Sequence, residues 1–221
     1  MSALKGKEHE MKKQTETNSL GDKIASRRGK VLQGERECKY LQKGTVLWLT
    51  GLSGAGKTTL ANRLERVLVD QNKLAYMLDG DEVRRGLNSD LGFSAEDRCE
   101  NIRRIGEVAR LFADASFLVI VAFISPFKKD RDSIRKALSP GRFIEVFVDC
   151  SLKVCEKRDV KGLYKKARSG QIEDFTGISA PYEPPVFPEI HLRTDQKNVD
   201  ECIDEILTYL DGAMLFTNMK S

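Results

Sequence analysis

Apolar residues along the chain follow two patterns, which together predict alternating strands and helices. Short, nearly continuous apolar runs predict five strands, at residues 45–50, 74–79, 117–124, 143–149 and 189–193. Apolar residues that recur on one helical face predict helices at residues 57–71, 81–88, 95–115, 128–138, 151–158, 161–170 and 198–210. Such alternation implies crossover connections and a parallel sheet, and strands that are apolar on both faces require helices on both sides. We therefore expect a three-layer α/β fold, with a five-stranded parallel sheet flanked by helices.

The two ends of the chain differ from this core. Residues 1–22 are polar, rich in Lys and Glu and without periodicity, so we expect a disordered tail. Residues 23–44 are basic and are interpreted as an arm or short helix packed on the domain. The domain itself is expected at residues 45–210, and no role can be read for the tail at 211–221. A length of 221 residues fits one α/β domain with such extensions.

Composition narrows the possible partners and compartment. The net charge of +4, from 37 basic and 33 acidic residues, is too small to indicate a nucleic-acid partner. The most apolar run, Phe117–Ile124, is too short to cross a bilayer, and the N-terminal residues contain no apolar signal segment. The five cysteines form no Cys-x-x-Cys pair and are odd in number, as expected for free thiols in a reducing compartment. We expect a cytoplasmic protein that binds neither nucleic acid nor membranes.

A phosphate-binding loop is the most informative motif of the chain. Residues 51–58 read GLSGAGKT, a full match to G-x-x-x-x-G-K-[ST], and they lie between a predicted strand and a predicted helix, as the motif requires. Glycines let backbone N–H groups surround phosphate oxygens, and the helix adds its positive end. Lys57 can reach the β- and γ-phosphates, and the Thr58 hydroxyl can bind Mg²⁺. The loop predicts nucleoside triphosphate binding, while the absence of an N-K-x-D motif disfavours a GTPase switch.

Two carboxylates follow the second predicted strand. Asp79 and Asp81 are separated by one glycine, at the sheet edge where the P-loop is also expected. They are well placed to bind Mg²⁺ or to accept a hydroxyl proton. The alternative is a simple turn in which Asp81 caps the next helix. Beside a P-loop we favour the functional interpretation.

The helix predicted at 95–115 starts with candidate ligands of a substrate. Ser94 is a typical N-cap residue, and Arg98 and Asn101 share a face near the helix start. The arginine could hold a phosphate and the asparagine a sugar or base edge, but a solvated helix face fits the spacing equally well.

Two further segments are expected near the same edge of the sheet. Ile124-Ser125-Pro126 ends the third strand and brings Ser125 there, although an ordinary turn serine is the simpler interpretation. The basic stretch 158–168 contains a glycine and is typical of a lid that closes over phosphates.

Six motifs together carry a family resemblance: GLSGAGKTT, LDGDEVR, LGFSAEDRCENIRR, FISP, RDVKGLYKKAR and DFTG. In their order and spacing they resemble the adenylyl-sulfate kinases, from about Lys43 to Leu210. Those enzymes use MgATP to phosphorylate the ribose 3′-hydroxyl of adenosine 5′-phosphosulfate, or adenylyl sulfate. The resemblance implies a P-loop kinase fold with a basic lid, ATP and Mg²⁺ as cofactors, adenylyl sulfate as the small-molecule substrate, and a homodimer.

The resemblance also implies individual residue roles. Those that hold the ATP phosphates are Gly51, Leu52, Ser53, Gly54, Ala55, Gly56, Lys57, Thr58 and Thr59, with Arg158 as a platform for the adenine. Thr58 and Asp79 would hold the metal, and the catalytic set would be Lys57, Asp79, Asp81 and Ser125. The adenylyl sulfate would contact Asp81, Arg84, Phe93, Arg98, Asn101, Ile124, Ser125, Lys161 and Phe175. The family assigns a phosphoserine intermediate to the Ser125 position, whereas in-line transfer needs positioning and charge neutralisation more than a covalent relay.

Two departures from relatives refine the expectation. Plant members carry a regulatory cysteine in the helix after the P-loop, where this chain has Asn62, so we expect no thiol switch by that route. Fused relatives include an ATP sulfurylase domain with an H-x-G-H motif, which the two histidines, His9 and His191, cannot supply. The chain is therefore expected to perform the kinase step alone.

Two rival interpretations remain open. Another small-molecule P-loop kinase would keep Lys57 and Asp79 but would not need the acceptor residues. A non-catalytic nucleotide-binding module would be expected to have lost Lys57, Asp79 or the bases of the lid.

Overall fold

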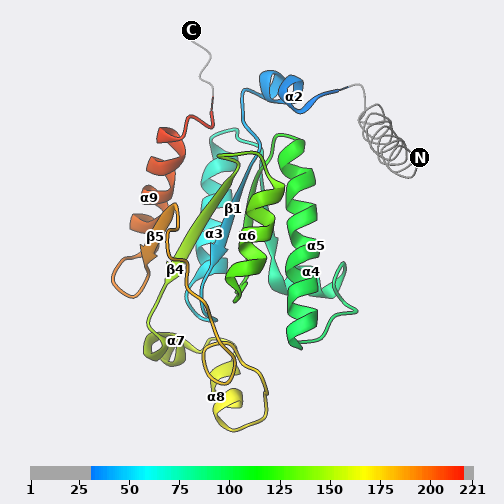
Figure 1. Ribbon diagram of the computed structural model, residues 1–221. Coiled ribbons are helices and arrows are strands. Elements are labelled where there is room, and N and C mark those ends of the chain that lie inside the picture. Colours follow the sequence, from blue (N-terminus) through cyan, green and yellow to red (C-terminus); the bar gives the residue numbers. More distant parts are fainter. Residues whose placement is uncertain (1–30, 217–221) are drawn as a thin grey trace, which may run out of the picture.

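The computed structural model describes residues 31–216 (Figure 1). The expectation of a disordered segment at 1–22 lies outside the described residues, as do residues 23–30 of the predicted arm and 217–221 of the tail.

The five predicted strands form one parallel sheet. They are β1 (Thr45–Thr50), β2 (Ala75–Asp79), β3 (Leu118–Ala122), β4 (Phe143–Asp149) and β5 (Ile190–Arg193), in the order β2-β3-β1-β4-β5. Every neighbouring pair is parallel. The central strand, β1, is buried along its whole length and leads directly into the P-loop. The expected five-stranded parallel sheet is confirmed.

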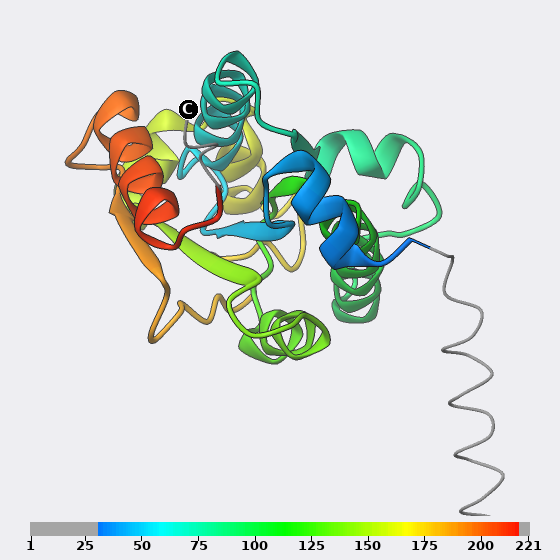
Figure 2. The same ribbon diagram turned by 90° about the horizontal axis from the view of Figure 1, so that it is seen from above.

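Helices cover both faces of the sheet and create two cores. On one face, α3 (Lys57–Asp70) and α9 (Val199–Gly212) pack over Leu47 and Leu49 of β1. On the other, α5 (Ala95–Asp114) and α6 (Lys128–Ala137) pack over Val46 and Trp48. Figure 2 shows α9 (red-orange) and α6 (green) on opposite sides of the sheet. The alternation along β1 is the period of two that a strand buried on both sides requires.

Short helices gather at the carboxyl end of the sheet. α4 (Gly80–Arg85) follows β2, while α7 (Leu152–Arg158) and α8 (Leu163–Arg168) follow β4 (Figure 1). The basic stretch 158–168, expected as a lid, runs from the end of α7 through α8. The helix predicted at 81–88 is shorter than expected, because the chain turns at Gly86 and the side chain of Asn88 becomes buried. The helix predicted at 161–170 starts later, because Gly162 has a left-handed φ of 65° and caps it.

The arm and the C-terminal segment pack together at the opposite end of the sheet from α8 (Figure 1). α2 (Gln33–Tyr40) is tied to the domain by an ion pair between Arg36 and Asp114 at 3.0 Å. The backbone N–H of Lys43 donates to the carbonyl of Leu215, whose side chain is buried in the core. Residues 211–216, for which no role could be read, therefore complete the hydrophobic core beneath the arm. Among the helices at 31–216, none has the length and apolar character needed to cross a membrane.

Candidate active site

The P-loop connects β1 to α3 in a conformation that depends on its glycines. A Cβ atom on Gly51 would lie 2.3 Å from the carbonyl oxygen of Val148, so no larger residue fits against β4. Gly56 caps α3 with a φ of 101°, which side-chain-bearing residues rarely adopt. The loop thus begins by passing close to the β4 backbone and ends at the positive N-terminus of a long helix, the arrangement that binds phosphate groups.

Lys57 is buried at the base of this loop. Its Nζ donates to the carbonyls of Gly51 at 2.9 Å and of Leu52 at 2.8 Å. Burial lowers the pKa of Lys57 to about 8, since the surroundings disfavour the charged form. Phosphate oxygens beside the ammonium group would favour the charged form again, so the site is suited to an anion.

Two predicted metal-binding groups lie in direct contact. The Thr58 hydroxyl donates to Oδ2 of Asp79 at 2.9 Å, and the other carboxylate oxygen accepts from the backbone N–H of Asp81 at 2.8 Å. Within residues 31–216, no group of three or more His, Cys, Asp or Glu side chains could hold a metal ion. The Thr58 hydroxyl and the Asp79 carboxylate instead fit Mg²⁺. Proteins commonly bind this ion through few side chains, with phosphate oxygens and waters as its other ligands.

The basic lid reaches the same place from the other side. Lys161 forms an ion pair with Asp81, and Tyr164 of α8 donates its hydroxyl to the carbonyl of Ser53 at 2.9 Å. Arg158 lies further out, where it donates to the carbonyls of Gly54 at 3.3 Å and Thr194 at 2.6 Å. The lid therefore contacts both the P-loop and the carboxylates that follow β2.

Several of the predicted acceptor residues form a second group, around the start of α5. The guanidinium of Arg84 lies over the ring of Phe93, 4.5 Å from its centroid, and this ring is 66% exposed. Arg98 donates to the carbonyl of Phe93 at 2.9 Å and to the hydroxyl of Thr176 at 2.5 Å. Thr176 follows Phe175, so Arg98 joins this group to the loop after the lid.

Asn101 is also part of this region, with a partner that the sequence did not indicate. Its Oδ1 accepts from the Nδ2 of Asn88 at 2.8 Å, and both side chains are buried. No motif marked Asn88, because its partner becomes apparent only once α4 ends early.

The turn after β3 contains Ile124 and Ser125, and Ser125 has an unusual backbone conformation. Ser125 has a φ of 42°, is 2% exposed, and accepts from the indole N–H of Trp48 at 3.0 Å. The Thr50 hydroxyl donates to the carbonyl of Ile124 at 2.7 Å. The hydroxyl of Ser125 thus faces the core, and the turn is fixed by side chains of β1 that the sequence analysis did not select.

A cavity of about 630 Å³ opens beside the P-loop, between the end of β4 and the segment that follows Phe175. Leu52 borders it together with Phe147, Asp149 and Tyr182. The predicted acceptor residues do not line it.

A P-loop on the central strand, a nearby carboxylate and a basic lid define a small P-loop phosphotransferase. The family model described as Adenylylsulphate kinase matches residues 43–193, which is more than half of the chain. The chain belongs to the adenylyl-sulfate kinase family. This confirms the family and the three-layer P-loop kinase fold inferred from the motifs.

Individual relatives agree with this assignment. A probable adenylyl-sulfate kinase of Halalkalibacterium halodurans is 58% identical over 180 residues, covering 81% of this chain and 89% of that protein. An adenylyl-sulfate kinase of Marinobacter nauticus is 57% identical over 181 residues, covering 82% and 91%. A solved Mycobacterium tuberculosis APS kinase, in complex with AMPPNP and APS, is 46% identical with a TM-score of 0.73, covering 77% of this chain and 99% of that one.

Proposed function

We propose that this chain transfers the γ-phosphoryl group of ATP to the 3′-hydroxyl of adenylyl sulfate, giving 3′-phosphoadenylyl sulfate. This is the reaction of its family and the second step of sulfate activation. The proposal for this chain rests on one observation: two groups of residues, a nucleotide-binding one and an anion-binding one, lie at the same end of the sheet. The P-loop with Thr58 and Asp79 suits a nucleotide, and the group around Arg98 suits a second, anionic substrate.

On the donor side, residues 51–59 surround the phosphates, and Lys57 lies against the β- and γ-phosphates. Thr58 and Asp79 hold Mg²⁺, which neutralises phosphoryl charge when bound. Arg158, already bonded to the P-loop carbonyl of Gly54, supports the adenine. Its exposed position between Gly54 and Thr194 supports this role.

On the acceptor side, the exposed ring of Phe93 provides an aromatic surface for adenylyl sulfate, whereas Phe175, a further predicted contact, is buried and packs edge-on against Tyr164. The other predicted contacts are Asp81, Arg84, Arg98, Asn101, Ile124, Ser125 and Lys161. Because Ser125 directs its hydroxyl at Trp48, we propose that its turn binds the substrate through the main chain and that the phosphoryl group passes directly between substrates. Asp79 orients the reacting hydroxyl.

The reaction is tested by supplying MgATP with adenylyl sulfate, gluconate or nucleoside monophosphates. We expect a 3′-phosphorylated product from adenylyl sulfate and background turnover of the other acceptors. Turnover of gluconate or a nucleotide without turnover of adenylyl sulfate would favour the rival interpretation of another small-molecule P-loop kinase. The homodimer implied by the resemblance and the cytoplasmic location expected from the composition belong to the same proposal, and light scattering tests the dimer.

Replacement of Arg98 should separate the two substrates. Arg98→Ala is expected to raise KM for adenylyl sulfate by roughly ten-fold or more and to change KM for ATP little, because charge-assisted hydrogen bonds at the acceptor group are lost. Steady-state kinetics with each substrate varied in turn measures this. The matched control is Arg103→Ala in the same helix, whose guanidinium is exposed and pairs with Glu100. Equal weakening of both substrates by Arg98→Ala would remove Arg98 from the acceptor site.

Activity should be insensitive to thiol oxidation. Cys38 is exposed on α2, at the end of the sheet away from the lid, Cys99 of α5 is half-buried, and Cys150, Cys155 and Cys202 are buried. We expect less than about a two-fold change in activity between oxidised and reduced glutathione, because a disulfide needs Cα atoms within about 7 Å. The comparison is made for the wild type and Cys38→Ser. A reversible, several-fold switch that disappears in Cys38→Ser would reveal a disulfide, within the chain or between two Cys38 thiols of a dimer.

A further inference from the structure

Arg131 of α6 is a buried, charged side chain, and the proposed reaction does not use it. It is 1% exposed, and its Nε donates to Oε1 of Glu145 at 2.7 Å. Its remaining two nitrogens donate to main-chain carbonyls, of Ser125 at 2.7 Å and of Glu183 at 2.7 Å. One guanidinium therefore joins β4, the turn after β3 and the loop that follows the lid.

The loop at residues 174–184, here called the strap, is held at both ends by arginines. Arg98 binds its first end, through the Thr176 hydroxyl and the carbonyl of Asp174. Arg131 binds its other end at Glu183, whose backbone N–H also donates to the carbonyl of Pro126 at 2.9 Å. The strap carries Phe175, so the position of that ring depends on both attachments.

The Ser125 turn depends on the same guanidinium. A residue other than glycine with a φ of 42° is costly, and it persists only where its surroundings determine it. Trp48 fixes the hydroxyl of this residue and Arg131 fixes its carbonyl. Without the second bond, a buried carbonyl would lack its charged donor and the turn could relax.

We propose that Arg131 is the positioning residue of the acceptor site. It sets the spacing between the Ser125 turn and the strap, and it does so without contacting a substrate. The proposal rests on the proposed function, because it assigns that spacing to the binding of adenylyl sulfate.

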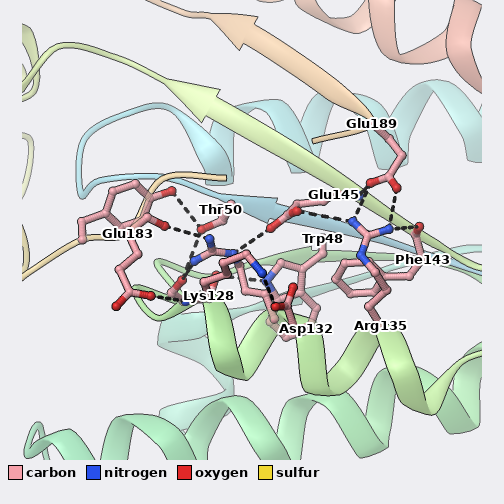
Figure 3. A network of polar contacts seen from close by, with 12 residues as sticks. Trp48, Thr50, Lys128, Asp132, Arg135, Phe143, Glu145, Glu183 and Glu189 are labelled. Carbon is pink, nitrogen blue, oxygen red and sulfur yellow. Dashed lines mark hydrogen bonds and ion pairs between the residues drawn. The ribbon is translucent and has the colours of Figure 1, made fainter. Parts of the chain in front are cut away.

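Arg135, one turn further along α6, provides a matched comparison. It shares Glu145 with Arg131, at 3.3 Å, and pairs with Glu189 at 2.5 Å. Figure 3 shows Glu183 at one end of this network and Arg135 with Glu189 at the other. Arg135 donates to the carbonyl of Phe143 and makes no hydrogen bond to the Ser125 turn or the strap among the described residues. If loss of ion pairing alone alters the enzyme, variants of both arginines should be affected. If positioning is the cause, only the variant of Arg131 should be affected.

The test compares Arg131→Lys with Arg135→Lys. Lysine keeps the charge beside Glu145 but lacks the planar fork that reaches two carbonyls at once. We expect Arg131→Lys to raise KM for adenylyl sulfate about ten-fold, with KM for ATP changed less than about two-fold, since one or two charge-assisted bonds are lost. Arg135→Lys should leave both constants within about two-fold. An equal rise of both constants in Arg131→Lys, or no rise in either, would refute the positioning role.

A second variant covers the case in which Arg131→Lys does not fold. The carboxylate of Glu183 is exposed and accepts from the backbone N–H of Lys128 at 2.7 Å, so Glu183→Ala loosens the same end of the strap without leaving a buried charge. It should raise KM for adenylyl sulfate about three-fold, in line with the loss of one hydrogen bond to a charged group. No change in that constant would count against the proposal.

Amide hydrogen exchange distinguishes failure of this proposal from failure of the proposed function, because it needs no substrate. We expect exchange at residues 174–184 to be about ten-fold faster in Arg131→Lys than in Arg135→Lys, which reports local opening of the strap. A wild type that does not turn over adenylyl sulfate would reject the proposed function alone. Equal exchange of the strap in the two variants would reject the positioning role, whatever the substrate.

Discussion

Lys57→Ala is expected to reduce kcat by roughly 10² to 10³-fold. The ammonium group would stabilise charge that moves between the β- and γ-phosphates during transfer, and removal of one such preorganised group typically costs a factor of this size. Burial of Lys57 strengthens the effect, because charges interact more strongly where they are shielded from solvent. Single-turnover measurements at saturating MgATP and adenylyl sulfate report the chemical step directly.

The loop itself also loses contacts in this variant. The carbonyls of Gly51 and Leu52 lose their donor, so weaker ATP binding is expected as well. Lys136→Ala, which removes an exposed lysine of α6, is the control for a general change of charge. Far-UV circular dichroism should show that both variants fold. A folded Lys57→Ala enzyme with a kcat near that of the wild type would contradict the role of Lys57 in transfer.

Asp79→Asn is expected to lower kcat by about 10²-fold with a smaller change in ATP affinity. The substitution keeps an oxygen that can accept from the backbone N–H of Asp81, so the start of α4 should be preserved. What it removes is the negative charge beside Thr58, which would help to hold Mg²⁺ or orient the 3′-hydroxyl. The measurement is kcat over a wide range of Mg²⁺ concentrations.

The Mg²⁺ dependence separates the two roles of Asp79. A kcat that recovers at high Mg²⁺ would indicate metal binding, and a kcat that stays low would indicate orientation of the hydroxyl. Asp90→Asn, at a surface ion pair with Arg104, is the matched control. Near-normal kcat of Asp79→Asn at every Mg²⁺ concentration would exclude both roles.

Local patterns in the sequence were sufficient for the elements of the sheet but not for its order. Each strand is a short apolar run that can be recognised on its own, and the P-loop motif identifies the strand that precedes it. The order β2-β3-β1-β4-β5 depends on pairing between distant segments, which no local pattern encodes. The ends of two parallel strands were enough to expect Asp79 near the P-loop, but its direct contact with Thr58 appears only in the folded chain.

The residues that support the site were the hardest to predict. Glu145 interrupts an apolar strand and Arg131 lies in a polar helix, so each alone is typical of a solvated position. Glu145 is buried because Arg131 and Arg135 of α6 lie over it, and Arg131 also contacts the strap, an irregular loop that leaves no periodic signal. Asn88 and Trp48 likewise act through partners that only the folded chain brings near them.

The contact between the arm and the C-terminal segment has a consequence for how the core is closed. Gln42 pairs with Phe216 in an antiparallel bridge, so the segment that leads into β1 and the segment that follows α9 lie side by side. They do so at the end of the sheet opposite the lid (Figure 1). The contact between these two segments therefore closes the core at the end of the sheet away from the P-loop and the lid.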